Sequence, residues 1–298
     1  MPTPSAPAPN DRRSMRFANH DGRATIVLND TTGIDVESAS KGKFGSNPAS
    51  VYGVWDVFVD WAATVNPTDS VLTLHRSRLG APSPEPRQIF AIGLNYRDHA
   101  AESGFDLPDR LPPVFTKFQS SLTGPDTTVT LPAGGNTDWE VELVVVIGRE
   151  TKGVGKAEAW GSVAGLAVGQ DLSERISQLQ GPAPQFSFGK SHAGFAPVGP
   201  WLVTPDELSD PDDLELGCAI DGDVVQRGRT SDLVFDVPEL ISSLSHGVTL
   251  YPGDLIFTGT PAGVGLARQP QRYLQPGEEL RSWVEGIGEI HQVFTADR

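Results

Sequence analysis

A short apolar run that follows two glutamates constrains the fold of this chain most. Residues 143–147 read Leu-Val-Val-Val-Ile, and Gly148 ends the run. Such a β-branched segment is typical of a strand with a buried face. Side chains two apart on a strand point the same way, so Glu140 and Glu142 are predicted to project together, roughly 6–7 Å apart. They need a counter-charge such as a divalent metal ion, unless they are simply solvated acids on an exposed strand face. The pair alone leaves both interpretations equally open.

Composition limits the class of protein. The 298 residues suffice for a full hydrophobic core in one large domain or two unequal ones, and 32 Gly with 25 Pro favour turns and strands. A net charge of −15 argues against nucleic acid or an anionic membrane as partner, although a local cation or metal could still bind an anionic substrate. The single Cys218 excludes internal disulfides and fits a reducing cytoplasm. No apolar run is long enough to span a membrane and no signal peptide is recognised, so a cytoplasmic protein is expected.

The chain divides into three segments. Residues 1–14 are rich in Pro, Ala and Ser and are predicted to be disordered. Residues 15–80 are predicted to form a small N-terminal α/β domain, with a strand over 23–28 and a helix over 49–64. Three prolines within residues 80–86 defeat regular structure, so a larger domain is expected over 87–298.

The larger segment shows mostly strand and turn signals. A strand is predicted over residues 88–93, and Asp221-Gly222 between two apolar runs predicts a hairpin. Pro238 is expected to open a helix over 238–246, which Gly247 stops. The predicted fold class is therefore α+β, mostly β.

A third carboxylate extends the glutamate pair. Asp171 follows the apolar strand predicted over residues 165–170. Together with Glu140 and Glu142 it supplies hard oxygen ligands suited to Mg²⁺, Mn²⁺ or Ca²⁺, whereas no Cys cluster or His pair has zinc spacing. Three carboxylates leave coordination positions open for water and substrate. Taken alone, Asp171 could equally cap the N-terminus of a following helix.

A histidine–glutamate pair is a candidate general base. If residues 95–102 are helical, His99 and Glu102 lie three apart on one face and can hydrogen-bond. A carboxylate fixes the imidazole tautomer and prepares it to activate water. In isolation, a surface His–Glu pair is the favoured interpretation. The stretch 103–108 that follows is interpreted as a lid.

Polar residues after Asp171 are candidates for substrate binding. On a helix starting at Leu172, the side chains of Arg175 and Gln178 would lie on the same side as Asp171. Arginine and glutamine there could bind a substrate carboxylate or carbonyl, although solvated helix residues are the favoured interpretation without context.

Two glycine-containing motifs resemble phosphate-binding loops only superficially. The sequence Phe-Gly-Lys-Ser at 188–191 has Pro184 where a P-loop needs glycine, so Lys190 is interpreted as a cation near the metal. In the turn at 259–265, the backbone amides, including that of Gly259, and the Thr260 hydroxyl could bind a carboxylate.

Five motifs in chain order together resemble the fumarylacetoacetate hydrolase superfamily. They are Gly93-Leu94-Asn95-Tyr96-x-x-His99-Ala100-x-Glu102, Glu140-x-Glu142-Leu143, Asp171-x-x-x-Arg175-x-x-Gln178, Gly189-Lys190-Ser191 and Gly259-Thr260-Pro261-Ala262-Gly263-Val264-Gly265. The resemblance covers about residues 87–298, and residues 15–80 resemble the small N-terminal domain of many bacterial members.

The resemblance implies a homodimer whose C-terminal catalytic domain is a roll or sandwich of mixed β-sheets. It also implies a Mg²⁺ or Mn²⁺ site, a His–Glu dyad and a set of substrate contacts. The implied metal ligands are Glu140, Glu142 and Asp171, the catalytic residues are His99, Glu102 and Lys190, and the substrate contacts are Arg175, Gln178, Lys190, Gly259 and Thr260. Two departures from the family pattern, Gln170 before Asp171 and His192-Ala193 after Ser191, leave the role of His192 and the substrate open.

The activity implied is that of an acylpyruvase or of a 2-hydroxyhepta-2,4-diene-1,7-dioate isomerase-like member. The leading hypothesis is hydrolysis of a carbon–carbon bond in an acylpyruvate- or fumarylpyruvate-like diketo acid, through a metal-stabilised enolate and water activated by the dyad. An oxaloacetate-type decarboxylase or an oxo-diacid isomerase or tautomerase is the alternative. The intact site residues count against a third possibility, a catalytically idle binding protein with the same fold.

Overall fold

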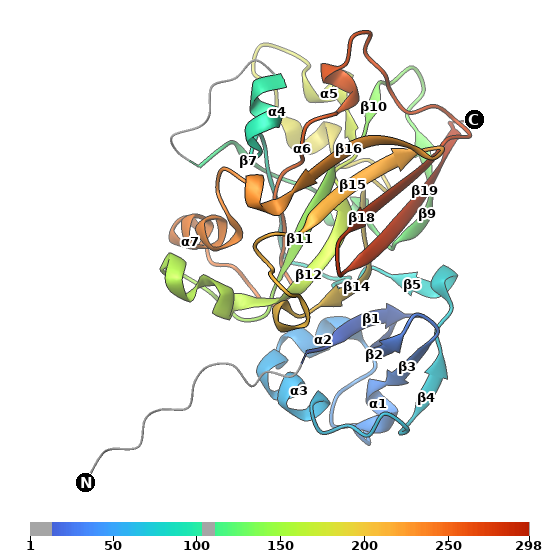
Figure 1. The fold of residues 1–298 in the computed structure, drawn as a ribbon, viewed down its shortest axis with the longest axis vertical. Helices are drawn as coiled ribbons and strands as arrows, with labels where there is room; N and C mark the ends of the chain where they lie inside the picture. Colours follow the sequence, from blue (N-terminus) through green and yellow to red (C-terminus); the bar gives the residue numbers. More distant parts are fainter. Residues whose placement is uncertain (1–13, 103–110, 298) are drawn as a thin grey trace.

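The computed structural model describes residues 14–102 and 111–297 (Figure 1). The predictions of a disordered tail over 1–14 and of a lid over 103–108 fall almost wholly outside these residues. Within them the chain is mostly β, as predicted. In this part of the chain no helix is long and apolar enough to cross a membrane.

The N-terminal lobe, drawn in blue in Figure 1, combines a small antiparallel sheet with short helices. Its elements are β1 Arg16–His20, β2 Arg23–Asn29, β3 Thr32–Asp35, α1 Val36–Ala39, α2 Pro48–Tyr52, α3 Trp55–Ala62, β4 Val71–Thr73, the 3₁₀ turn η1 Arg76–Arg78 and β5 Leu79–Gly80. The single helix predicted over 49–64 is wrong, because α2 ends at Tyr52 and α3 begins only after Val54, whose backbone is not helical.

The strands of the N-terminal lobe belong to the same large sheet as strands from the rest of the chain. That sheet runs β4-β3-β2-β1-β14-β12-β11-β17-β6-β7, and β1 pairs antiparallel with β14. Its further strands are β6 Ile89–Ile92, β7 Val114–Thr116, β8 Leu122–Thr123, β11 Val141–Ile147, β12 Val163–Gln170, β14 Ala196–Val203 and β17 Leu255–Phe257. The domain boundary near residues 80–87 stays a prediction.

A second, five-stranded sheet in the order β16-β15-β18-β19-β9 completes the β structure. Its strands are β9 Asp126–Leu131, β15 Glu215–Ile220, β16 Asp223–Arg229, β18 Glu279–Val284 and β19 Gly288–Ala296, while β10 Thr137–Asp138 pairs with β13 Ser173–Glu174. The predicted hairpin at Asp221-Gly222 is confirmed, since it joins β15 to β16 with positive φ at both residues (50° and 91°).

The remaining helices are short and lie around the sheets (Figure 1). They are α4 Arg97–Glu102, α5 Arg175–Gln178, α6 Phe186–Gly189, α7 Val237–Gly247 and the 3₁₀ turns η2 Gln119–Ser121, η3 Lys156–Ser162, η4 Pro205–Glu207, η5 Thr230–Asp232 and η6 Gly265–Ala267. The predicted helix over 238–246 is confirmed as α7. The helix predicted from Leu172 instead begins at Arg175, because Ser173 and Glu174 first pair with β10.

Strand β11 lies in the middle of the large sheet. The side chains on its two faces pack into two different hydrophobic clusters. Leu143, Val145 and Ile147 pack in the core cluster shared with the second sheet, and Val144 and Val146 pack in the cluster shared with the N-terminal lobe. Side chains alternate along a strand, so Glu142 continues the face of Val144 and Val146 toward the strand's start. The sheet therefore places the predicted glutamate pair at a buried edge of its apolar core.

Candidate active site

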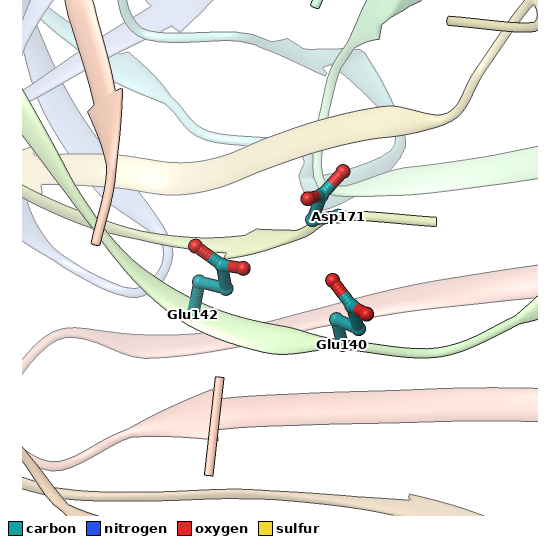
Figure 2. Close-up of side chains that lie close together, drawn as sticks. All are labelled: Glu140, Glu142 and Asp171. Carbon is teal, nitrogen blue, oxygen red and sulfur yellow. The ribbon is translucent and has the colours of Figure 1, made fainter. Parts of the chain in front are cut away.

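Three carboxylates meet where β11 begins and β12 ends. Glu140 precedes β11, Glu142 lies on it, and Asp171 follows β12, whose antiparallel pairing brings the Asp171 amide 2.9 Å from the Glu140 carbonyl. One oxygen of each carboxylate lies within 4.8 Å of the others, and the side chains converge in Figure 2. All three residues are buried, so the interpretation as solvated surface acids is wrong. Asp171 is not a helix cap either, because Glu174 caps α5.

Buried cations balance two of these carboxylates. The Lys190 ammonium bridges Glu140 Oε2 at 2.5 Å and Asp171 Oδ2 at 2.7 Å. Lys117 donates to the other Asp171 oxygen at 2.5 Å and to the Lys190 carbonyl. Burial opposes the charge of Lys190, but Asp171 and Glu140 outweigh it and raise the pKa of this lysine. Lys190 therefore stays protonated at neutral pH.

Glu142 has a different electrostatic environment. It forms no ion pair with any described residue, and the backbone amide of Gly259 donates to its Oε2 at 2.7 Å. Burial, together with the charges of Asp171 and Glu140, raises the pKa of Glu142 well above its ordinary value. Burial acts the same way on Glu140, but there Lys190 and Arg175 prevail and lower the pKa. The uncompensated negative charge of the triad is thus concentrated at Glu142.

Arg175 is held by a fully buried aspartate. Its Nε and Nη2 donate to Asp138 Oδ2 at 2.9 and 2.7 Å, Nη2 also reaches Glu140 Oε1 at 2.7 Å, and Nη1 donates to Gln178 Oε1 at 2.9 Å. The backbone amides of Gly265 and Leu266 donate to Asp138 as well. Asp138 therefore ties α5 to η6 and fixes the guanidinium beside the triad. The predicted substrate contacts of Arg175 and Gln178 stay predictions.

The histidine–glutamate pair lies on α4. His99 Nδ1 is 2.7 Å from Glu102 Oε1, and the Gly263 amide donates to both oxygens of that carboxylate at 3.1 and 3.0 Å. His99 is only 8% exposed, whereas Glu102 is exposed, so the imidazole does not lie on the surface as the surface-pair interpretation requires. The catalytic role of the pair stays a prediction. The bond at Nδ1 leaves Nε2 as the ring nitrogen available for proton transfer.

The dyad and two of the three carboxylates, Glu140 and Glu142, line one cavity of about 530 Å³, while Asp171 is buried against Lys190. Arg175, Gln178, Lys190 and Thr260 line it too. The turn after β17, which begins at Gly259 and Thr260, packs against the strand that carries Glu142. The Thr260 hydroxyl donates to the Val141 carbonyl at 2.8 Å, and Gly259 comes so close to Asn95 that an added Cβ would lie 2.8 Å from the asparagine Cβ. Both predicted turn residues thus contact strand β11 or its glutamate.

This arrangement of motifs recurs in known proteins. The model of the family "Fumarylacetoacetate (FAA) hydrolase C-terminal" matches residues 88–295. The chain belongs to this family of enzymes.

Relatives within the fumarylacetoacetate hydrolase family share most of the chain. A 2,4-didehydro-3-deoxy-L-rhamnonate hydrolase from Sphingomonas sp. is 47% identical over 217 residues, which are 72% of this chain and 75% of the relative. A solved structure from Mycobacterium smegmatis, provisionally named HpcE, is 55% identical with a TM-score of 0.88 and covers 95% of this chain and 100% of its own. The maleylpyruvate hydrolase of Sphingobium sp., solved with manganese and pyruvate, is 28% identical with a TM-score of 0.78 and the same coverage.

The residues of this family member fit a divalent cation. Four buried carboxylates, those of Asp138, Glu140, Glu142 and Asp171, face the buried cations of Lys117, Arg175 and Lys190. At ordinary charges, one negative charge is left over. Burial first, and then the charges of Asp171 and Glu140, raise the pKa of Glu142, while burial lowers the pKa of Lys117. The candidate ligands are carboxylate oxygens, which suit Mg²⁺, Mn²⁺ or Ca²⁺.

Two residues of this cluster have no assigned role in the sequence-based prediction. Asp138 stands directly before the predicted pair, but a buried arginine partner 37 residues away gives no local signal. Lys117 is a lone lysine after β7, between aromatic and polar residues, and only the fold brings it to Asp171.

His192, whose role the sequence left open, lies outside the residues that line the cavity. Its ring packs on Phe195 at 5.0 Å, and its Nε2 is buried without a hydrogen-bond partner in the described chain. Burial lowers the pKa of His192, which favours a neutral ring.

Proposed function

We propose that this enzyme is a divalent-metal-dependent hydrolase that cleaves a carbon–carbon bond in a diketo acid of the acylpyruvate or fumarylpyruvate kind. The observation that carries the proposal is that the His99–Glu102 dyad, Lys190 and two carboxylates of the acidic triad, Glu140 and Glu142, line one cavity, with Asp171 buried against Lys190. The hydrolases among the relatives support it, as does the Sphingobium enzyme solved with manganese and pyruvate.

Glu140, Glu142 and Asp171 would hold the metal, with Mg²⁺ or Mn²⁺ expected and Ca²⁺ possible for an all-oxygen site. When bound, the metal supplies Lewis-acid polarisation of the substrate's oxygens. Lys190, kept protonated by Asp171 and Glu140, donates hydrogen bonds to the oxygen on which negative charge develops. Arg175 and Gln178 orient the carboxylate or carbonyl groups of the substrate.

The dyad activates the attacking water. His99 takes a proton from water at Nε2, while Glu102 accepts from Nδ1 and stabilises the imidazolium. Hydroxide adds to the carbonyl carbon distal to the 2-oxo acid group. The carbon–carbon bond then breaks, its electron pair leaves with the 2-oxo acid fragment as an enolate, and a proton converts this fragment to the free 2-oxo acid. The other product is a carboxylic acid.

The reaction is tested by assaying acylpyruvates, fumarylpyruvate and oxaloacetate with Mg²⁺, with Mn²⁺ and after treatment with a chelator. We expect metal-dependent release of pyruvate and a carboxylic acid from the diketo acids. Decarboxylation or isomerisation without any carbon–carbon hydrolysis would replace the proposal with the alternative activities. Failure to bind either metal in a calorimetric titration would favour an idle binding protein.

The dyad is tested by His99→Ala. Loss of a general base typically lowers turnover by about 10²–10⁴-fold, and metal affinity should persist because His99 is not among the candidate ligands. His192→Ala is the matched control, since His192 does not line the cavity. Unchanged turnover in His99→Ala would remove the dyad from the mechanism.

We also propose a cytoplasmic homodimer that acts on a small molecule. Light scattering of the purified protein tests the oligomeric state, and a monomeric mass would contradict it.

A further inference from the structure

The cavity has an ionic part and an apolar part that meet at Phe115. The Lys190 ammonium lies 4.9 Å from the centre of the Phe115 ring, and this ring packs edge-on against Phe186 at 5.5 Å. Leu179 lines the cavity at the end of α5, whose neighbour α6 carries Phe186. Phe115, Phe186 and Leu179 therefore give the cavity an apolar wall that begins beside Lys190.

Other elements contribute apolar groups to the same cavity. Leu94 and Ile92 come from the end of β6, and Val264 and Leu266 come from the turn that carries η6. Leu94 has φ +56°, a left-handed conformation that bulky side chains rarely adopt. Strained residues of this kind cluster at functional sites. The Asn95 side chain donates to the carbonyls of Thr258 and Phe235, which holds the strained segment in place.

Every cationic group that lines the described part of the cavity already has a carboxylate partner. Lys190 is paired with Glu140 and Asp171, and Arg175 with Asp138 and Glu140. The His99 ring, neutral as a general base, is bonded to Glu102. A second carboxylate at the far end of a substrate would therefore find no unpaired cation there. Gln178 and Gln269 are uncharged and can hydrogen-bond a carbonyl or hydroxyl oxygen instead.

The net charge of the buried cluster around Glu140, Glu142 and Asp171 also favours a substrate with a single carboxylate. Its four carboxylates exceed its three cations by one negative charge. A divalent ion turns this into one positive charge, which a single carboxylate neutralises. A dianionic substrate would place its second carboxylate along the apolar wall without a cation beside it, and such a charge is disfavoured where the wall covers it.

We propose that the substrate carries one carboxylate only, held at the ionic part, and that its tail along the Phe115–Phe186–Leu179 wall is uncharged and largely apolar. The inference rests on the proposed function and narrows its substrate class to acylpyruvates with neutral tails, at the expense of the fumarylpyruvate-like diacids.

Two isosteric 2-oxo acids test the selectivity without any turnover. 5-Methyl-2-oxohexanoate and 2-oxoglutarate have the same chain length and number of non-hydrogen atoms, and they differ in ending with an isopropyl group or a carboxylate. We expect the manganese-loaded enzyme to bind the neutral-tailed acid roughly 100-fold more tightly in calorimetric titrations. Equal or tighter binding of 2-oxoglutarate overturns the proposal, as does binding of neither acid. Since neither ligand is a diketo acid, this result is independent of whether the enzyme hydrolyses acylpyruvates.

A charge introduced into the wall provides the second test. Leu179 is 47% exposed, so Leu179→Arg can be accommodated and would place a guanidinium at the cavity. We expect it to strengthen binding of 2-oxoglutarate by about tenfold relative to Leu179→Gln, which has similar length and no charge. Ile176→Arg controls for a general field effect, because Ile176 is 52% exposed on α5, three residues before Leu179, but does not line the cavity. If Leu179→Arg and Ile176→Arg strengthened 2-oxoglutarate binding equally, the proposed position of the substrate tail beside Leu179 would be wrong.

Discussion

Two fully buried clusters of this enzyme are built from opposite chemistry. In the N-terminal lobe, Phe17 contacts the rings of Tyr52, Trp55 and Phe58 edge-on at centroid distances of 5.5–6.0 Å. Burial of such rings and their edge-to-face contacts stabilise the fold directly. In the proposed catalytic centre, buried space is filled with carboxylates, lysines and an arginine, whose desolvation offsets much of their mutual attraction.

The comparison indicates that the aromatic cluster contributes mainly to stability, whereas the ionic cluster is arranged for reactivity at some cost in stability. The rings of Phe17, Tyr52, Trp55 and Phe58 can be optimised for packing because none of them lines the cavity. The ionic cluster instead keeps a carboxylate without an ion-pair partner among the described residues, Glu142, whose charge a bound cation or a proton can neutralise. Active sites commonly carry such unfavourable groups, so removing one is expected to raise stability while it lowers activity.

The largest expected effect is that of Glu142→Gln. A glutamine can still accept from the Gly259 amide, but it removes one candidate ligand and the excess charge. We expect kcat/KM to fall by at least about 10³-fold, equivalent to roughly 4 kcal/mol, while the Tm of the metal-free protein rises. Kinetics and thermal unfolding after chelation measure the two effects. Glu158→Gln, at an exposed position, is the control and should change neither. A lower Tm in Glu142→Gln would mean that Glu142 stabilises the fold.

Phe58→Ala should show the reverse pattern. Phe58 is fully buried between Phe17, Phe44 and Trp55. Truncation of such a ring typically costs about 3–5 kcal/mol of unfolding free energy. Urea unfolding measures this loss, and kcat measured well below the unfolding transition should stay unchanged. A parallel loss of kcat in the folded protein would show that the two clusters are coupled.

Asp138→Asn is expected to have an intermediate effect, because Asp138 positions Arg175 without lining the cavity. Loss of a residue that orients groups around a metal site typically lowers activity or metal affinity by roughly 10–100-fold. Steady-state kinetics should show the change mainly in kcat, with the Asp138→Glu variant recovering less than wild-type activity. If kcat/KM is unaffected, the clamp on Arg175 has no catalytic consequence.

Several features of the fold and site were predictable because their signals are local. The β-branched run of β11, the Asp221-Gly222 hairpin and the capped α7 all have signals within a few residues. The convergence of Glu140, Glu142 and Asp171 follows from strand alternation together with the pairing of β11 and β12. The motifs themselves then indicated the family, which the family model confirms.

Other features depend on contacts between distant segments, which a single sequence does not reveal. Lys117 reaches Asp171 across 54 residues. The break between α2 and α3 lets the Tyr52 and Trp55 rings stack at 5.3 Å, although the local sequence favours one helix. The short α5 is likewise set by the pairing of Ser173–Glu174 with β10.

The smallest expected effect concerns pH, and its sign differs between the two parts of the molecule. In the N-terminal lobe, hydrogen bonds from Arg23 lower the pKa of Asp35 to about 2. A lowered carboxyl pKa gives stability that is present above the unfolded-state value near 3.9 and is lost as pH falls through about 2. Since the Arg23 side chain is 41% exposed, solvent screening reduces the contribution to about 1 kcal/mol.

For Glu142, the pH dependence of the unfolding free energy has the opposite sign. Its raised pKa means that the metal-free fold is favoured below the unfolded-state value and loses that advantage as pH rises toward the folded-state pKa. We therefore expect Asp35→Asn, which keeps a helix-capping side chain, to be less stable than wild type at pH 7 and equally stable near pH 2. Metal-free Glu142→Gln should be more stable than wild type at pH 7 and should match it below about pH 4. Urea unfolding of both variants across this range measures the differences, and the same sign for both would contradict the electrostatic distinction between the two regions.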